Sequence, residues 1–90
     1  MEDSSENNLF EHLKYKIITD KYGSIRYYNS DGKLHREDGP AITYASGTKK
    51  WYCNGDLHRD NGPAVIESDG TVEWWEHGRF VKWYFRTSKV

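Results

Sequence analysis

The sequence contains little cysteine, no long apolar run and no excess of either charge. Its single cysteine, Cys53, excludes an internal disulfide and fits a reducing compartment. No apolar run approaches the roughly 20 residues that a membrane-spanning helix requires. The 13 basic and 14 acidic residues leave a net charge of -1, which gives no electrostatic reason to expect nucleic acid or an anionic membrane as a partner. The segment Met1 to Ser5 has no signal-peptide character, and we expect a cytoplasmic protein.

Aromatic side chains, in contrast, are abundant. Hydrophobic residues make up only 36% of the chain, but 16% of the chain is aromatic, with 4 Trp and 7 Tyr. A chain that is poor in aliphatic residues and rich in broad rings favours a thin layered structure over a thick globule. The 90 residues predict one domain, near the lower limit of what a single core stabilises. We assign residues 14–90 to this domain and residues 1–13 to an N-terminal segment.

A period of 23 residues runs through this domain. The motif Leu-His-Arg-x-x-Gly-Pro-Ala begins at Leu34 and again at Leu57, and one extra residue before Gly32 lengthens the first unit. An internal period of this length predicts a stack of one small structural unit. Further pairs of residues at the same offset are His35 and His58, Gly39 and Gly62, Gly47 and Gly70, Trp51 and Trp74, and Gly55 and Gly78.

Two alternating kinds of glycine-containing turn separate the motifs. Pairs such as Asn54-Gly55 supply the positive φ angles that tight hairpin turns require. The runs between turns have five or six residues rich in Tyr, Trp, Thr, Val and Ile, which is typical of β-strands. The sequence therefore predicts an all-β fold, an antiparallel meander of tandem β-hairpin repeats of about 23 residues. The seven predicted strands are 14–20, 24–29, 40–44, 48–53, 63–68, 71–76 and 79–85.

The two ends of the chain depart from this repeat. Residues 1–13 contain Leu9, Phe10 and Leu13 at helical spacings, so we predict a short helix or a tail there. At residues 80–82, Phe-Val-Lys replaces Leu-His-Arg, and no Gly-Pro-Ala follows. We interpret both ends as caps, because terminal repeats that face water commonly deviate from the pattern.

Alternation along the strands sorts the paired aromatic residues onto two faces. Tyr27, Trp51 and Trp74 share one face with Ile25 and Val72, and we predict that this face is buried. The opposite face is predicted to be partly exposed and to bind a partner. Its aromatic residues are Tyr28, Tyr52 and Trp75, and the charged residues beside them are Arg26, Lys50 and Glu73.

His35 and His58 occupy equivalent positions in the motif. An imidazole at such a position could ligate a metal or act as a general base. A catalytic group is normally needed once, whereas a framework group is needed in every unit. We therefore predict that both histidines hold their loops by bonding backbone carbonyls. No catalytic residue, metal site or cofactor is predicted, since no phosphate-binding loop, metal-spaced cluster or nucleophile elbow is present.

Each histidine is followed by an arginine, Arg36 or Arg59. Its guanidinium could bind a phosphate or a partner's carboxylate, or it could pair with an acidic residue of its own loop. We favour the local pair and keep both arginines as candidate partner-binding residues. The glycine of each Gly-Pro-Ala segment is predicted to permit a left-handed turn, and the proline to fix entry into the next strand. These structural residues are Gly39, Pro40, Gly62 and Pro63.

The spacing Trp-x-x-Asn-Gly-x-x-His, followed by a glycine and then by Asp-Gly and the next Trp, resembles the MORN repeat over residues 22–80. MORN units are of similar length and form stacked β-hairpins. The chain departs from that pattern at Arg36 and Arg59, where MORN units usually have glycine, and in its Gly-Pro-Ala segments. The variant spelling is similar to repeats in proteins of tailed bacteriophages and large DNA viruses.

The resemblance implies an interaction scaffold. We therefore expect a non-enzymatic protein-binding module, a small phage or viral accessory protein that engages a host protein in the host cytoplasm, with inhibition of a defence factor as one form of this function. An alternative is a protein that binds a nucleotide or an oligosaccharide through its aromatic column and loop arginines. An enzyme that uses His35 or His58 is the third reading. Open strand edges also leave a homo-oligomer possible.

Overall fold

A computed structural model of the chain describes residues 14–85. These residues form β-strands, turns and loops without any helix, so the predicted all-β class is confirmed. The helix or tail predicted for residues 1–13 lies outside the described residues. The strands are β1 (Lys16–Thr19), β2 (Ile25–Tyr28), β3 (Ile42–Thr43), β4 (Lys49–Lys50), β5 (Tyr52–Cys53), β6 (Asp56–Leu57), β7 (Val65–Ile66), β8 (Thr71–Glu76) and β9 (Arg79–Phe85).

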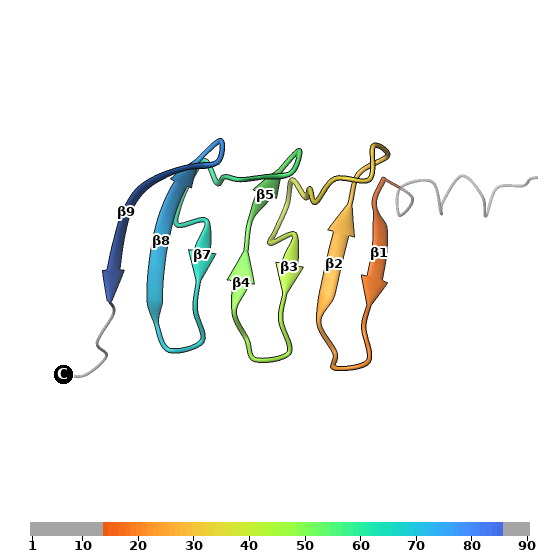
Figure 1. Cartoon of the computed structure of the whole chain (residues 1–90), viewed down its shortest axis with the longest axis horizontal. Helices are drawn as coiled ribbons and strands as arrows, with labels where there is room; N and C mark the ends of the chain where they lie inside the picture. The colour runs from red at the N-terminus through yellow and green to blue at the C-terminus, as the bar shows by residue number, and fades with distance from the viewer. Residues whose placement is uncertain (1–13, 86–90) are drawn as a thin grey trace, which may run out of the picture.

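Seven of these strands form one antiparallel sheet in the order β1-β2-β3-β4-β7-β8-β9. Each of the seven predicted strands overlaps one strand of this sheet. The exception to the prediction is the segment 48–53, which divides at Trp51 into β4 and β5. β5 pairs with β6 in a separate small hairpin. Figure 1 shows the strands of the main sheet side by side in one row, with connections at two ends.

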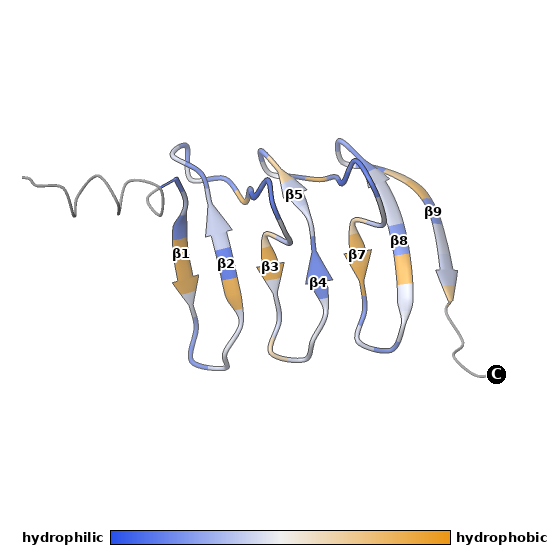
Figure 2. Cartoon of the chain, turned by 180° about the vertical axis from the view of Figure 1, so that it is seen from behind, coloured by the Kyte–Doolittle hydropathy of each residue, from blue (hydrophilic) through white to orange (hydrophobic). Residues whose placement is uncertain are grey.

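The core of this one-layer sheet is small. Ala41 and Ala64 are fully buried, and Ile42, Val65 and Val72 are nearly so. Among residues 14–85, no helix or second large sheet covers either face. Figure 2 shows apolar segments on β1, β3, β7 and β8, with the hydrophilic β4 between β3 and β7. The buried residues are therefore those in the middle of the row of strands, where neighbouring strands and their side chains cover them.

Ile42 and Val65 illustrate how a single layer buries aliphatic residues. Ile42 pairs with Arg26 on β2 and with Lys50 on β4, and Val65 pairs with Lys50 and with Glu73 on β8. Paired residues of neighbouring strands point to the same face. Each aliphatic side chain therefore has a long charged side chain on both sides, whose carbon stem covers it while the charged head stays in water.

Two kinds of turn connect the strands, as the sequence predicts. At one end, three turns share a bond from a glycine amide to the carbonyl three residues earlier. At the other end, Asn54-Gly55 and His77-Gly78 form two-residue hairpin turns, in which all four residues have positive φ, from 48° to 90°. The corresponding first turn closes from Asn29 to Lys33 and is one residue longer, which accounts for the extra residue before Gly32.

Candidate partner-binding surfaces

Two loops join successive hairpins at the end where the two-residue turns lie. We call residues 35–40 linking loop 1 and residues 58–63 linking loop 2. Each follows a short return segment, at Leu34 or Leu57, and each leads through Gly-Pro-Ala into the next strand of the sheet. Ala41 and Ala64 then exchange backbone hydrogen bonds of 2.7–2.8 Å with both neighbouring strands. The linking loops therefore start and end on rigid parts of the fold.

The histidines of the linking loops connect one hairpin to the next. His35 Nδ1 accepts the backbone N–H of Asn54 at 2.9 Å, and His58 Nδ1 accepts the backbone N–H of His77 at 3.0 Å. Both imidazoles are largely buried, with 14% and 11% of the side chain exposed. The prediction of bonds to backbone carbonyls is wrong in this respect, because the partners are amides of the next hairpin turn. Asn54 and His77 are the first residues of the two-residue turns and have positive φ.

The second ring nitrogen of each histidine faces a carboxylate. His58 Nε2 lies 2.7 Å from Asp60 Oδ1, and His35 Nε2 lies 3.4 Å from Glu37 Oε2. Since Nδ1 accepts a hydrogen bond from an amide, Nε2 carries the proton of the neutral ring and donates it. The bond from His35 is the main cause that lowers the pKa of Glu37, and Lys14 adds to it. Each histidine thus uses both nitrogens, which supports a framework role.

The arginines of the linking loops stack on aromatic rings. Arg36 Cζ lies 4.0 Å from the ring centre of Tyr27, and Arg59 Cζ lies 3.9 Å from that of Trp51. A guanidinium over an aromatic face gains cation–π attraction and buries its own flat surface. Lys82 takes the equivalent place near the end of the chain, with Nζ 4.9 Å from the ring centre of Trp74.

Gly39 and Gly62 leave room for these guanidinium groups. A Cβ on Gly39 would lie 2.9 Å from Arg36 Cζ, and a Cβ on Gly62 would lie 2.9 Å from Arg59 Nη1. Neither glycine has a positive φ. The prediction that these glycines permit a left-handed turn is therefore wrong, since their role is to admit the arginine. Within the same loops, Nη1 of each arginine donates to the carbonyl of Pro40 at 3.3 Å or of Pro63 at 3.2 Å.

The local ion pairs of the two arginines differ. Arg36 Nε donates to Asp38 Oδ1 at 3.0 Å, as predicted. In linking loop 2, Asp60 bonds to His58, and no carboxylate among residues 14–85 lies within ion-pair distance of Arg59. The predicted local pair is thus present at Arg36 and absent at Arg59.

The six paired aromatic residues do not separate into a buried and an exposed column. All six are half-buried, so the prediction of a buried face is wrong for its rings and holds only for Val72. The physical reason is the single layer, in which neither face is covered by other elements. The six residues are Tyr27, Trp51 and Trp74 on one side and Tyr28, Tyr52 and Trp75 on the other.

Arg26 and Lys50, predicted as a polar rim, flank the side chain of Tyr44. Arg26 Cζ lies 5.6 Å and Lys50 Nζ lies 5.5 Å from the ring centre of Tyr44. Arg26 also donates to Asp20 Oδ2 at 3.0 Å, and this bond is the largest cause that lowers the pKa of Asp20. Arg26 and Lys50 are also the cross-strand neighbours of Ile42, so their side chains cover Ile42 as well as forming part of the surface.

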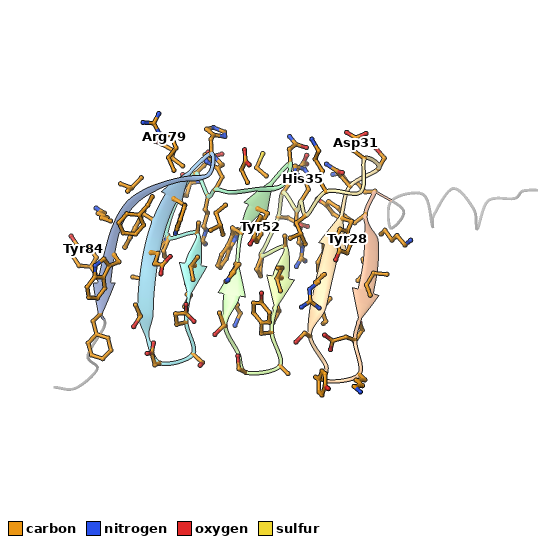
Figure 3. The ribbon with its side chains drawn as sticks, in the orientation of Figure 1. Tyr28, Asp31, His35, Tyr52, Arg79 and Tyr84 are labelled. Atoms are coloured by element: carbon orange, nitrogen blue, oxygen red, sulfur yellow. The ribbon has the colours of Figure 1, made fainter. Side chains whose placement is uncertain are left out.

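A pocket of about 580 Å³ lies between linking loop 1 and linking loop 2. Its floor includes Trp51, Tyr52 and Cys53, and its walls are the two loops. Three carboxylates line it together with two guanidinium groups, so it carries both signs of charge. Figure 3 shows Tyr28, His35 and Tyr52 toward the end of the sheet where the linking loops lie. Of the predicted partner-binding residues, Arg36, Tyr52 and Arg59 line the pocket, and Arg26, Tyr28, Lys50 and Trp75 do not.

A second surface is the last strand of the sheet, which the sequence analysis interprets as a cap and whose open edge it leaves available to a second copy. Every residue of β9 is exposed. Its large apolar side chains, Phe80, Val81, Trp83, Tyr84 and Phe85, are 52–57% exposed. The signal for this surface was present in the sequence, because no Gly-Pro-Ala segment follows Lys82 to start another hairpin.

Comparison of the chain with protein-family models, with curated proteins and with solved structures gives no match in any of the three cases. The resemblance to the MORN repeat therefore stays a prediction. Residues 14–85 contain no helix of the length and apolar character that crossing a membrane requires. In the same part of the chain, no group of three or more His, Cys, Asp and Glu residues is placed to hold a metal ion.

Proposed function

We propose that this chain is a non-enzymatic protein-binding module, built as tandem β-hairpin repeats of about 23 residues with the MORN-like spacing described above. The recurrence of the same contacts at this offset supports the repeat. His35 bonds the amide of Asn54 as His58 bonds that of His77. Both loop arginines stack on an aromatic ring and donate to the carbonyl of the proline in their own loop. Side chains that serve the same structural purpose in each copy are typical of repeat proteins.

The pocket between the linking loops is the observation that carries the binding function. Its walls are short loops, and a rigid scaffold that presents loops is a common design for recognition. Histidine and arginine contacts fix both loops from beneath, so little conformational freedom is lost when a partner binds. We infer that the pocket receives a segment of a protein partner.

The charges of the pocket favour a polypeptide over a phosphorylated ligand. Glu37, Asp38 and Asp60 stand against Arg36 and Arg59, and Asp38 already occupies Arg36. A phosphate group in the pocket would face a carboxylate on each of the two loops. Like charges held close together in an interface cost several kcal/mol of binding free energy, on the order of what excludes wrong partners. A protein segment offers both backbone polar groups and side chains of either sign, which suits this mixture.

An oligosaccharide is a second candidate ligand. The volume of about 580 Å³ lies in the range of small-molecule sites, and Trp51 and Tyr52 on the floor provide ring edges and faces for a sugar. Trp51 is, however, already stacked by Arg59 on one face. This contact leaves less aromatic surface for a ligand than a free stacking platform would.

The nature of the partner rests on resemblance. The motif Leu-His-Arg-x-x-Gly-Pro-Ala is similar to repeats of phage and large-virus proteins, so we propose that the partner is a host protein met in the host cytoplasm, a defence factor being one such target. The geometry of the pocket supports binding and carries no information about the source of the partner.

A capture experiment with matched variants tests this function. Asn61 is exposed and lines the pocket, whereas Ser30 is exposed in the Asn29–Lys33 turn and does not. Asn61→Trp places a bulky ring at the pocket wall, and Ser30→Trp adds the same ring elsewhere. We expect the unmodified chain and Ser30→Trp to capture one stoichiometric protein from host lysate.

With the purified partner, Asn61→Trp should weaken affinity by at least about ten-fold, measured by calorimetry. Equal affinity of Asn61→Trp and the unmodified chain would remove the pocket as the binding site. Stabilisation of the chain by oligosaccharides, without capture of a protein, would favour the second candidate.

A further inference from the structure

The outer edge of β9 is the largest unpartnered feature of the described chain. β9 pairs with β8 along one side only, and it is the last strand in the order of the sheet. An edge strand exposes a row of unpaired backbone N–H and C=O groups, which readily accept another strand. On β9 this backbone row runs between side chains that are all exposed, most of them apolar. Tyr84 is visible at this side of the sheet in Figure 3.

We propose that β9 is a dimerisation edge, at which β9 of a second copy of this chain adds in antiparallel register about a two-fold axis through Trp83. This inference concerns a surface separate from the pocket between the linking loops, and it does not depend on the proposed function. Three observations favour a second β9 as the strand that pairs at this edge: the direction of the strands, their charge and the match of their side chains.

Strand direction excludes a head-to-tail extension of the sheet in favour of a two-fold pair. Every neighbouring pair in the sheet is antiparallel, so β1 and β9, the first and seventh strands, run in the same direction. Figure 1 shows both arrows pointing the same way. A second copy added by translation would place its β1 parallel to β9 and break the pattern. Two β9 strands related by a two-fold axis are antiparallel, which matches the rest of the sheet.

The two cations of β9 restrict the registers in which two copies of this strand can pair. β9 carries Arg79 and Lys82 and no carboxylate. Centring the two-fold axis on Lys82 would oppose two ammonium groups, and like charges directly opposite are destabilising. Centring it on Val81 would leave two aromatic residues, Tyr84 and Phe85, beyond the end of the second strand, whereas centring it on Trp83 leaves Arg79 and Phe80 there.

Centring the axis on Trp83 makes the two edges self-complementary. Trp83 then faces Trp83 of the second copy, Lys82 faces Tyr84, and Val81 faces Phe85. Aromatic pairs and cation–π pairs across strands are favourable. The contact between Lys82 and Tyr84 already exists within one chain, with Nζ 5.6 Å from the ring centre. In this register each exposed apolar residue from Val81 to Phe85 gains a neighbour, and no like charges are opposed.

Opposite charges introduced at the axis test this register. Trp83→Lys and Trp83→Glu each place two like charges on the axis, so each variant alone should dissociate at least about ten-fold more readily than the unmodified chain. Mixing the two variants should restore a dimer, because one lysine then faces one glutamate. The assay is sedimentation equilibrium over a concentration series, with circular dichroism to check folding. Tyr22→Lys and Tyr22→Glu are the controls, because Tyr22 is 71% exposed in a turn away from β9.

Disulfide capture provides a second arm that does not depend on charge. In a Cys53→Ser background, Trp83→Cys places the same thiol on both sides of the axis, at a Cα separation that a disulfide can span. Val81→Cys is the matched control, because residues 81 of the two copies would lie about 13 Å apart along the strands. Rapid covalent dimer formation by Trp83→Cys and not by Val81→Cys is expected. A chain that is monomeric at all concentrations, no rescue on mixing, or equal cross-linking by both cysteine variants would each overturn the proposal.

Discussion

An internal connection and the last connection of the sheet differ in length. Lys50 of β4 pairs with Val65, fifteen residues later, because the chain first passes through β5, β6 and linking loop 2. Glu73 of β8 pairs with Trp83, only ten residues later, because β9 turns at His77-Gly78 and runs straight back. The internal detour is the part that contains histidine, arginine and Gly-Pro-Ala.

The comparison shows the structural role of the additional residues in the internal connection. In linking loop 2 the extra residues place an arginine over Trp51 and a histidine against the next turn, and they deliver Ala64 into the sheet. At the end of the chain, Lys82 keeps a cation over Trp74, but Val81 stands where a histidine would be. The internal loop therefore continues the sheet, whereas the last strand completes a hairpin and leaves an edge.

The largest expected effect contrasts two tryptophans. Trp51 is half-buried beneath Arg59, whereas Trp83 is 57% exposed on β9. We expect Trp51→Ala to lower the free energy of unfolding by about 2–4 kcal/mol, somewhat less than a fully buried ring. Trp83→Ala should cost less than about 1 kcal/mol in the monomer. Urea denaturation at low protein concentration measures both, and similar losses for the two variants would contradict the distinction.

The linking histidines are expected to rank next. His58→Ala leaves the amide of His77 and the carboxylate of Asp60 without their partner, at a cost of about 1–3 kcal/mol. Val81→Ala, at the corresponding terminal position, should cost less than about 1 kcal/mol. His58→Gln should recover part of the loss, because its side-chain oxygen can accept the amide. Thermal melting of the three variants checks the order, and an unchanged melting temperature for His58→Ala would refute the linking role.

Gly62→Ala should cost about 1 kcal/mol, because its methyl group displaces the guanidinium of Arg59 from Trp51 and from the Pro63 carbonyl. The displaced group is the flexible end of a side chain, so the loss is that of its contacts. A double-mutant cycle sharpens the test. In an Arg59→Ala background, Gly62→Ala should have little effect, and additive losses would show that glycine is needed for another reason.

The smallest expected effect is a pH dependence at Asp20. Arg26 and then the amide of Ser24 lower the pKa of this carboxyl in the folded state. The Asp20 side chain is half-buried, and it adds stability above its unfolded pKa that is lost as the pH falls through the lower folded pKa. Asp20→Asn should flatten the acid limb of a stability curve slightly, at low ionic strength. An acid limb that is steeper in this variant would reverse the assigned sign.

Strand positions were predictable because local features determine them. Glycine turns and runs of β-branched and aromatic residues placed all seven strands of the sheet. The extra residue before Gly32 predicted a longer first unit, and the structure places that residue in the Asn29–Lys33 turn. The Asn54-Gly55 turn was predicted, but the division of the segment 48–53 at Trp51 and the return strand β6 were not, because two-residue strands carry no alternation pattern.

The site was less predictable because its contacts join residues far apart in sequence. The repeated histidine indicated a framework role, but its amide partner lies 19 residues away, in the next turn. Gly39 looked like a turn residue, and only the position of Arg36 reveals that it provides space. The burial of the two aromatic faces could not be predicted either, because alternation assigns residues to a face of the sheet without showing what covers that face.

Amide hydrogen exchange of Asn54 and His77 tests most directly the claim that each linking histidine holds the next hairpin. Each amide donates to one histidine, so the two serve as controls for each other. In His35→Ala we predict faster exchange at Asn54 and unchanged exchange at His77, and in His58→Ala the reverse. Unchanged exchange at both amides in both variants, with the fold intact, would contradict the account.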